Sequence, residues 1–103
     1  MKLVLVLTTL GADADAAALA RTLVEERLAA CVNVLPAMTS IYRWKGSVEQ
    51  DREQQLLIKT APERVAALEA RLRQLHPYEL PEFIRLEGEA SAAYSDWVRD
   101  STR

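Results

Sequence analysis

The alternation of apolar and polar positions divides the chain into strands and helices. Leu3–Leu7 is an unbroken apolar run of strand length, which is typical of a strand buried on both faces of a sheet. From Leu19 to Leu28 the apolar residues recur with helical period, and Asp13 or Asp15 can cap this helix by accepting from free backbone N–H groups. Cys31–Leu35 returns to strand character. The chain therefore opens with a strand, a helix and a second strand.

A long β-hairpin is predicted next. Thr39–Trp44 is rich in β-branched and aromatic residues, and Lys45–Gly46 marks a tight turn because glycine tolerates positive φ. The following segment, Val48–Thr60, is polar in its first half and apolar in its second. Periodicity alone leaves the polar half open as helix, loop or exposed strand. The turn signal, and the lack of a helix cap before Glu49, favour a hairpin with arms of roughly 10 residues.

A second helix is predicted after the hairpin. Thr60 and Glu63 have the spacing of a capping box, and Pro62 lies where no helical N–H is needed. The apolar stripe of this helix consists of Val65, Leu68, Leu72 and Leu75. His76–Pro77 ends it, because proline disfavours helical backbone at the residue before it.

The last elements are a short strand and a terminal helix. Phe83–Leu86 is a strand with Gly88 at its exit, and Ser91 can cap a helix whose apolar face is Tyr94, Trp97 and Val98. The order is therefore β-α-β-β-α-β followed by a helix. Right-handed crossovers turn this order into an α+β, ferredoxin-like sandwich, with both main helices on one side of the sheet. We expect one such domain over residues 1–103.

This arrangement leaves one sheet face uncovered. The predicted hairpin would also overhang a small sheet by tens of ångströms. Open edges and overhanging ribbons pair with other chains unless they are blocked. A closed homo-oligomer is the natural way to bury them.

Composition and charge exclude several classes of protein. The 103 residues carry a formal net charge of −2, which gives no electrostatic footprint for nucleic acid. No apolar run approaches the ~18 residues that a transmembrane helix needs, so we expect no membrane partner. The single cysteine cannot form an internal disulfide and favours a reducing compartment, so we expect a cytoplasmic protein.

Catalytic motifs are missing from the chain. It has no Gly-rich phosphate loop, no Gly-x-Ser-x-Gly elbow and no His-Glu-x-x-His pair. A single histidine without a paired nucleophile also argues against Ser-His or Cys-His chemistry. We therefore predict that the protein is not an enzyme.

The segment His76–Glu82 concentrates the polar chemistry of the chain. It places an imidazole, a phenol and two carboxylates around two prolines. The prolines restrict the backbone, so the segment is predicted to be a rigid linker. His76 is a candidate metal ligand, because neutral imidazole suits copper and zinc, with Glu79 or Glu82 as possible partners. The alternative is that His76 caps the preceding helix by satisfying its last carbonyls.

Other candidate residues have a structural and a functional interpretation. Cys31 lies among apolar neighbours, where a free cysteine is usually a small buried hydrophobe. Tyr42 and Trp44 share one face of the hairpin; base stacking is the alternative, but an oligomer contact is favoured because these residues are enriched at interfaces. Lys59 is a candidate to balance the charge of Glu79 and Glu82.

Three acidic residues alternate along the second arm of the hairpin. Glu49, Asp51 and Glu53 share one strand face and resemble a row of carboxylates for a hard metal ion. Arg52 and the neighbouring glutamines oppose that interpretation. A charged edge that discourages wrong strand pairing is favoured instead.

Several motifs in series resemble one known family. They are Leu28–Asn33, Ser40–Gly46, Lys59–Thr60 and His76–Glu82, with Tyr94 and Trp97 near the C-terminus. As a set, over essentially the whole chain, they resemble the CutA1 family of divalent-cation tolerance proteins. The resemblance implies a cytoplasmic homotrimer of ferredoxin-like subunits, whose long hairpins pair between neighbours. It also implies a role in tolerance to copper and other divalent metals.

The resemblance carries over particular residues. In the family, metal binding has been attributed to the histidine that matches His76 and to cysteines, of which Cys31 matches one. A further cysteine of some members falls at about Thr8, so this chain lacks one soft ligand. We expect weak binding of copper or another divalent ion through His76, Cys31 and Glu82, with no obligatory cofactor.

Two other functions remain open. PII signal-transduction proteins are trimers of similar architecture, so the alternative is a PII-like module that binds a small metabolite or nucleotide at the clefts between subunits. Tyr78, Glu82 and Lys59 would then line that cleft. The third possibility is a structural or partner-docking trimer without a ligand of its own.

Overall fold

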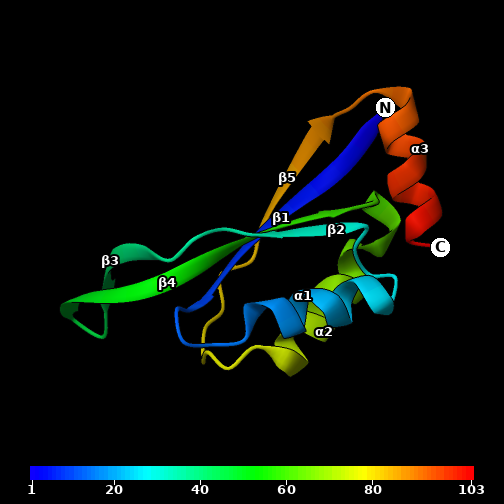
Figure 1. The fold of residues 1–103 in the computed structure, drawn as a ribbon. Helices are drawn as coiled ribbons and strands as arrows, with labels where there is room; N and C mark the ends of the chain where they lie inside the picture. Colours follow the sequence, from blue (N-terminus) through cyan, green and yellow to red (C-terminus); the bar gives the residue numbers. More distant parts are fainter.

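The computed structural model describes residues 1–103 and contains one five-stranded sheet with three α-helices (Figure 1). In chain order the elements are β1 (Lys2–Gly11), α1 (Ala16–Glu25), β2 (Cys31–Val34), β3 (Met38–Trp44), β4 (Ser47–Thr60), the 3₁₀ turn η1 (Pro62–Arg64), α2 (Val65–Leu75), β5 (Ile84–Glu89) and α3 (Ala92–Ser101). The order β-α-β-β-α-β and the terminal helix are as predicted from the sequence.

The sheet is antiparallel throughout, with β1 and β4 at its centre. The strand order is β2-β4-β1-β5, and β3 pairs with the other part of β4. Val4 lies opposite Thr60 and Gly11 opposite Glu53, so β1 and β4 pair along eight residues each. The β1–β5 pairing is shorter and ends at Leu7 opposite Ile84. β1 therefore continues beyond the end of β5, which matters for the site.

The main core lies between one face of the sheet and helices α1 and α2. Successive side chains of a strand point to opposite faces, and alternate positions of β1 and β4 are buried against these helices. The buried cluster consists of Val4, Val6, Leu10, Ala16, Leu23, Leu28, Ala29, Leu56, Ile58, Val65, Leu68 and Leu72. Both main helices thus cover one side, as expected.

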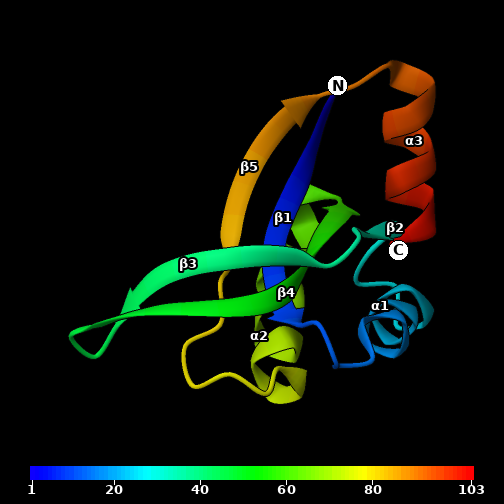
Figure 2. The same ribbon diagram turned by 60° about the vertical axis from the view of Figure 1, so that its left-hand side comes forward.

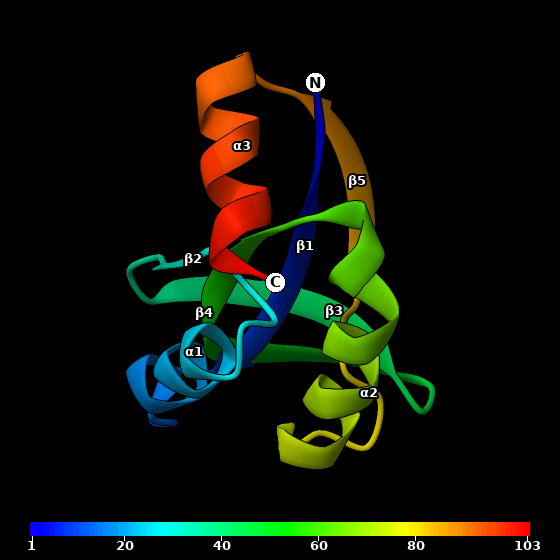
Figure 3. The ribbon, with the colours of Figure 1, turned by 90° about the vertical axis from the view of Figure 1, so that its right-hand side faces the viewer.

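Helix α3 packs on the opposite face, over one end of the sheet (Figure 3). Val98 of α3 joins Leu3, Ala30 and Ala61 in a second, smaller core. The rest of this face is only partly covered, and Ile84 and Leu86 are 44% and 47% exposed. The three α-helices have 10, 11 and 10 residues, and none is long and apolar enough to span a membrane.

A two-stranded arm projects from the sheet (Figure 2). It consists of β3 and the first part of β4, with Met38 opposite Glu53 and Trp44 opposite Ser47. Its turn has positive φ at Lys45 (47°) and Gly46 (84°), as the sequence signal predicted. The arm makes the molecule elongated, with extents of 45 × 24 × 23 Å.

Two local predictions are wrong. Thr60 does not cap the second helix: it is the last residue of β4, and its hydroxyl donates a 2.8 Å hydrogen bond to the Leu28 carbonyl in the core. The helix instead opens with a 3₁₀ turn at Pro62. Gly88 does not end the last strand but lies within β5, opposite Leu3. A Cβ at this position would make only an ordinary contact, 3.7 Å from the Leu3 side chain.

The other two helix caps are as predicted. Asp15 accepts from the backbone N–H of Ala18 at 3.0 Å and begins α1. Ser91 accepts from the N–H of Tyr94 at 3.2 Å and begins α3. Each side chain satisfies a helix N–H that has no partner within the helix.

Candidate functional site

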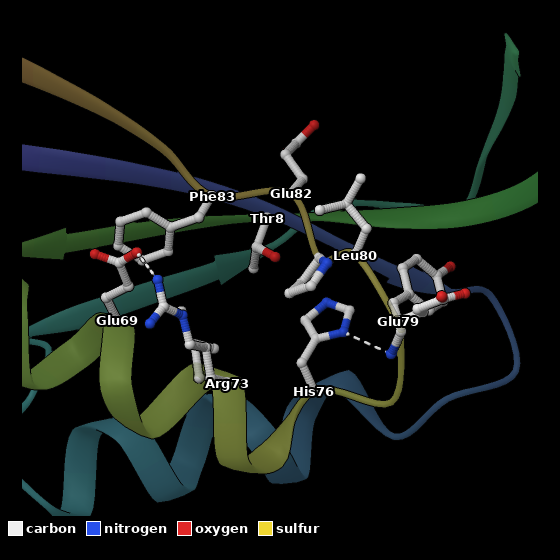
Figure 4. A pocket seen from close by; sticks show the side chains of 11 residues that line it. Thr8, Glu69, Arg73, His76, Glu79, Leu80, Glu82 and Phe83 are labelled. Atoms are coloured by element: carbon white, nitrogen blue, oxygen red, sulfur yellow. Dashed lines mark hydrogen bonds and ion pairs between the residues drawn. The ribbon is translucent and has the colours of Figure 1, made fainter. Parts of the chain in front are cut away.

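The candidate site is built around the segment His76–Glu82, which we call the strap. It begins where α2 ends, because Pro77 holds His76 in extended backbone (φ −78°, ψ 131°). The backbone N–H of His76 still donates to the Leu72 carbonyl at 2.8 Å. The strap then runs across the end of β1 toward β5 (Figure 4).

The His76 ring is bound by the backbone on both of its nitrogens. Nε2 lies 2.7 Å from the Thr9 carbonyl oxygen, and the Tyr78 N–H donates to Nδ1 at 3.1 Å. A carbonyl only accepts and an N–H only donates, so Nε2 carries the hydrogen and Nδ1 is unprotonated. The side chain is 8% exposed. The neutral Nε2–H tautomer is therefore the form that fits both contacts.

These contacts bear on the two interpretations of His76, as a metal ligand and as a helix cap. The ring does not bind the last carbonyls of α2, so the predicted cap is not what the side chain does. It binds the carbonyl of Thr9, in the part of β1 that extends beyond β5. His76 thus supplies a hydrogen-bond donor where the neighbouring strand has ended.

Tyr78 joins the strap to the base of the arm. Its hydroxyl donates to Glu53 Oε2 at 2.7 Å, and Glu53 is 9% exposed. Burial, followed by the hydrogen bond to Glu53, raises the pKa of Tyr78 well above its usual value. The phenol therefore stays protonated and remains a donor to the buried carboxylate.

Two glutamates of the strap bind other parts of the hairpin. Glu79 forms a 3.5 Å ion pair with Lys45 at the turn of the arm. Glu82 accepts a 3.0 Å hydrogen bond from the Gln55 side-chain amide on β4. The strap is therefore attached to β1, to β4 and to the tip of the arm.

A cavity of about 430 Å³ lies between α2 and the strap (Figure 4). Its lining comprises Thr8, Glu69, Leu72, Arg73, His76, Tyr78, Glu79, Leu80, Pro81, Glu82 and Phe83. Thr8 is fully buried, and its hydroxyl is the one buried side-chain polar atom without a hydrogen-bond partner. Arg73 and Glu69 pair across 2.8 Å at the side of the cavity. Seven of the eleven lining residues are polar or charged and four are apolar, so the cavity has a mixed lining.

Cys31 lies in another part of the subunit. It begins β2 opposite Lys59, whereas Thr9, which binds His76, lies opposite Gln55. Four strand residues between these positions on β4 correspond to about 13 Å. Cys31 is half-buried, on the strand surface rather than in the core as expected for a small hydrophobe.

Lys59 does not balance the charge of the strap. Its Nζ lies 6.0 Å from the centre of the Tyr94 ring of α3, while Lys45 is the lysine that pairs with Glu79. The predicted group of Tyr78, Glu82 and Lys59 is therefore not brought together within one subunit.

The predicted metal ligands do not fit one metal centre in the subunit. No three His, Cys, Asp or Glu side chains are grouped to hold an ion. His76 uses both nitrogens on the backbone, the Glu82 carboxylate points away from the His76 ring, and Cys31 lies at the other end of the sheet (Figure 4). Three or four converging ligands are the minimum for a stable copper or zinc site.

Tyr42 and Trp44 lie on the same face of the arm, as the alternation predicted. Tyr42 pairs with Glu49 and Trp44 with Ser47, and the Tyr42 hydroxyl donates to Asp51. This hydrogen bond is the main cause that raises the pKa of Tyr42 to about 12. Tyr42 is 40% exposed, so much of its surface remains available to another chain.

Sequence reasoning missed the roles of Glu53 and Gln55. Glu53 was grouped with Glu49 and Asp51 as an exposed acidic edge, but it is buried and accepts from Tyr78. The position of Glu53, next to the apolar half of β4, was the available signal. For Gln55, which binds Glu82, no signal in the sequence distinguishes it from Gln50 and Gln54.

Comparison with known proteins identifies the family. The model of the CutA1 divalent ion tolerance protein family matches residues 4–101. The Divalent-cation tolerance protein CutA of Thermus thermophilus is 47% identical over 94% of this chain and 95% of its own. The human Protein CutA is 49% identical over 82% of this chain, which spans only 48% of that longer protein.

Solved structures agree with this result. The Thermus thermophilus divalent cation tolerance protein (Cut A1) superposes with a TM-score of 0.91, at 46% identity and with complete coverage of both chains. A Nostoc protein described as a PII-like protein CutA superposes with a TM-score of 0.89, at 39% identity, over 100% of this chain and 98% of its own. The chain belongs to the CutA1 divalent ion tolerance protein family.

Proposed function

We propose that the protein is a non-enzymatic, cytoplasmic homotrimer of ferredoxin-like subunits that serves tolerance or response to divalent metal ions. The family and the names of its relatives support the role in metal tolerance. The strand order β2-β4-β1-β5, with α1 and α2 on one face, supports the ferredoxin-like assignment. The free thiol of Cys31 supports a reducing compartment.

The observation that carries the assembly is the arm. Within the subunit, nothing covers its apolar side chains: Ile41 and Val48 are 69% and 65% exposed. Ile84 and Leu86 expose further apolar surface on the sheet face beside α3. Exposed apolar residues on an unprotected ribbon are the mark of a surface that pairs with another chain. A closed trimer would bury the apolar side chains of all three arms against neighbouring subunits.

Sedimentation velocity tests the assembly. We expect a particle of three 11.5 kDa chains, and substitution of both Ile41→Asp and Val48→Asp should release single chains because it places charges in the contact. Val24→Asp, which places the same charge on an exposed apolar residue of α1 outside the arm, is the matched control and should leave the trimer intact. A native protein that sediments as one chain would remove the proposal.

We propose that copper or another divalent ion binds weakly, with ligands from more than one subunit. A single subunit brings no three ligands together, so a tight, closed centre has no support. Isothermal titration with Cu(II) tests this part. We expect weak binding that is lost in the Ile41→Asp/Val48→Asp variant, because the monomer lacks the shared ligands. Equal and tight binding by the monomeric variant would contradict it.

One observation favours the second candidate, a PII-like module that binds a small metabolite. The 430 Å³ cavity beside the strap has a mixed lining of apolar, polar and charged side chains, with an unpartnered Thr8 hydroxyl. A thermal-shift screen with nucleotides and organic acids, compared with divalent metals, separates the candidates. A rise in Tm with a metabolite that is absent in a Thr8→Phe variant, which fills the cavity, would support the second candidate over the first.

A further inference from the structure

His76 is the only histidine of the chain. Its ring contacts Thr9 on β1 and Tyr78 on the strap, and Tyr78 in turn contacts Glu53. All of these contacts lie within one subunit.

The ring replaces a strand at the edge of the sheet. β5 pairs with β1 up to Leu7, and beyond this residue the edge of β1 has no strand beside it. Thr9 is 8% exposed, so its carbonyl cannot rely on bulk water. The Nε2–H of His76 satisfies this carbonyl at 2.7 Å. A buried carbonyl left without a donor is costly, so a side chain that can donate to the Thr9 carbonyl is needed at this position.

The other nitrogen fixes the direction of the strap. Tyr78 N–H donates to Nδ1 across one turn of chain, and the two rings lie 4.9 Å apart between centroids. The hydrogen bond from Tyr78 N–H to His76 Nδ1 holds the backbone on either side of Pro77 in a turn. In this conformation the Tyr78 phenol reaches Glu53. The ring therefore connects the end of α2 to β1 and, through Tyr78, to the base of the arm.

A metal ion would have to break one of these contacts. Metal binding needs a nitrogen lone pair, and the only one on the neutral Nε2–H ring is on Nδ1, which the Tyr78 N–H already uses. Binding at Nε2 would displace its hydrogen and leave the Thr9 carbonyl unsatisfied. Either change leaves a backbone N–H or carbonyl without its hydrogen-bond partner next to residues that are only 8% exposed. Within the subunit, no second or third ligand is grouped with the ring to offset that cost.

We propose that His76 is a positioning residue and not a metal ligand. As the neutral Nε2–H tautomer it pins the strap to the edge of β1 beyond β5, and so holds Tyr78 on Glu53 at the base of the arm. Metal ions that the protein binds are held by other side chains. The strap keeps its shape whether or not a metal ion is present.

Nitrogen NMR of the native protein tests the proposal directly, because the chain has one histidine and its ring signals need no assignment by mutation. At neutral pH we expect one protonated nitrogen, Nε2, and one unprotonated nitrogen, Nδ1. Saturation with Zn(II), a diamagnetic probe, should leave both signals in place. Movement of either ring nitrogen to a metal-bound position, in proportion to added Zn(II), would overturn the proposal.

Variants separate positioning from ligation. His76→Ala removes both hydrogen bonds, so hydrogen exchange of the Tyr78 amide should become about tenfold faster or more. His76→Gln keeps a donor that can reach the Thr9 carbonyl and should retain more thermal stability than His76→Ala. Both variants should bind Cu(II) as the native protein does, because ligation does not involve the ring.

Cys31→Ser is the control for the metal measurement. It removes the one thiol of the chain and lies outside the strap, so Tyr78 amide exchange should not change. If His76→Ala and His76→Gln lost Cu(II) binding equally while Tyr78 exchange stayed at the native rate, His76 would be a ligand and the proposal would fail. If His76→Ala did not fold, His76→Gln and the native NMR titration would still decide.

Discussion

The two halves of strand β4 belong to one continuous strand but have different surroundings. Ser47–Arg52 is exposed at every position, whereas Glu53–Thr60 alternates between buried and half-buried residues. The second half packs on α1 and α2 and pairs with β1, while the first half pairs only with β3. The first half of β4 is therefore held within the subunit by hydrogen bonds to β3 alone. The second half is also stabilised by the apolar core.

The boundary between these halves lies at Glu53. There the strap reaches β4 through Tyr78, and two residues later through Glu82 and Gln55. The arm thus leaves the sheet at a point fixed by polar contacts rather than by apolar packing. We infer that the inner half sets the stability of the subunit and the outer half sets its contacts with other chains.

Truncation of the same strand on either side of the boundary should give the largest difference. Leu56→Ala removes a fully buried side chain of the inner half and should lower the free energy of unfolding by about 2–5 kcal/mol. Val48→Ala in the outer half removes a side chain that is 65% exposed in the subunit and should cost less than about 0.5 kcal/mol when both variants are measured as single chains, because a contact with another chain would add to the loss. Urea unfolding at one fixed protein concentration measures both values. Equal losses would show that the halves do not differ in this way.

The two phenol–carboxylate pairs lie on either side of the same boundary. Tyr78→Phe leaves the buried Glu53 carboxylate without its donor and should cost about 1–3 kcal/mol of unfolding free energy. Tyr42→Phe, on the arm, removes a hydrogen bond to the exposed Asp51 and should have a smaller effect. Thermal unfolding of both variants side by side measures the difference. A larger loss in Tyr42→Phe would contradict the boundary at Glu53.

Two buried threonines of the inner sheet, Thr60 and Thr8, differ in whether the hydroxyl has a hydrogen-bond partner. Thr60→Val removes a 2.8 Å hydrogen bond to the Leu28 carbonyl and should lower the unfolding free energy by about 1 kcal/mol. Thr8→Val removes a hydroxyl that has no partner, so it should be neutral or stabilising. Differential scanning calorimetry of the pair checks this. A destabilised Thr8→Val would mean that a water or ligand satisfies this hydroxyl in solution.

The smallest expected effect is a pH dependence of the arm. The hydrogen bond to Asp51 raises the pKa of Tyr42 to about 12, above the usual value of about 10. The folded state therefore binds the phenol proton more tightly, so this contact stabilises the fold below pH ~10 and is lost as the pH rises to about 12. Tyrosinate absorbance during an alkaline titration should show this late step, and Asp51→Asn should move it to lower pH.

Local patterns in the sequence predicted the structure best. The turn at Lys45–Gly46, the caps at Asp15 and Ser91 and the end of α2 before Pro77 depend on the backbone preferences of one or two residues. These were predicted correctly. The capping box at Thr60 failed although it has the same kind of signal, because pairing with β1 extends β4 to that residue and its hydroxyl binds the core.

The contacts of the candidate site were not accessible in the same way. His76 was interpreted as a helix cap or a metal ligand, and the cavity beside it was not predicted. Both depend on β5 beginning only at Ile84, opposite Leu7, while β1 continues to Gly11, which leaves the Thr9 carbonyl for the ring to bind. No residue near His76 in the sequence carries that information, since Thr9 lies 67 positions away.

The sequence by itself determined the elements, their order, the family and the exposed arm. Apolar periodicity, turn residues and motifs are properties of neighbouring positions, and they persist whatever the chain packs against. Only the tertiary structure decided that His76 is bound by the backbone on both nitrogens, that Glu53 is buried and that Cys31 lies away from them. The physical reason is that burial and hydrogen-bond partners depend on strand register, which joins residues that are distant in the chain.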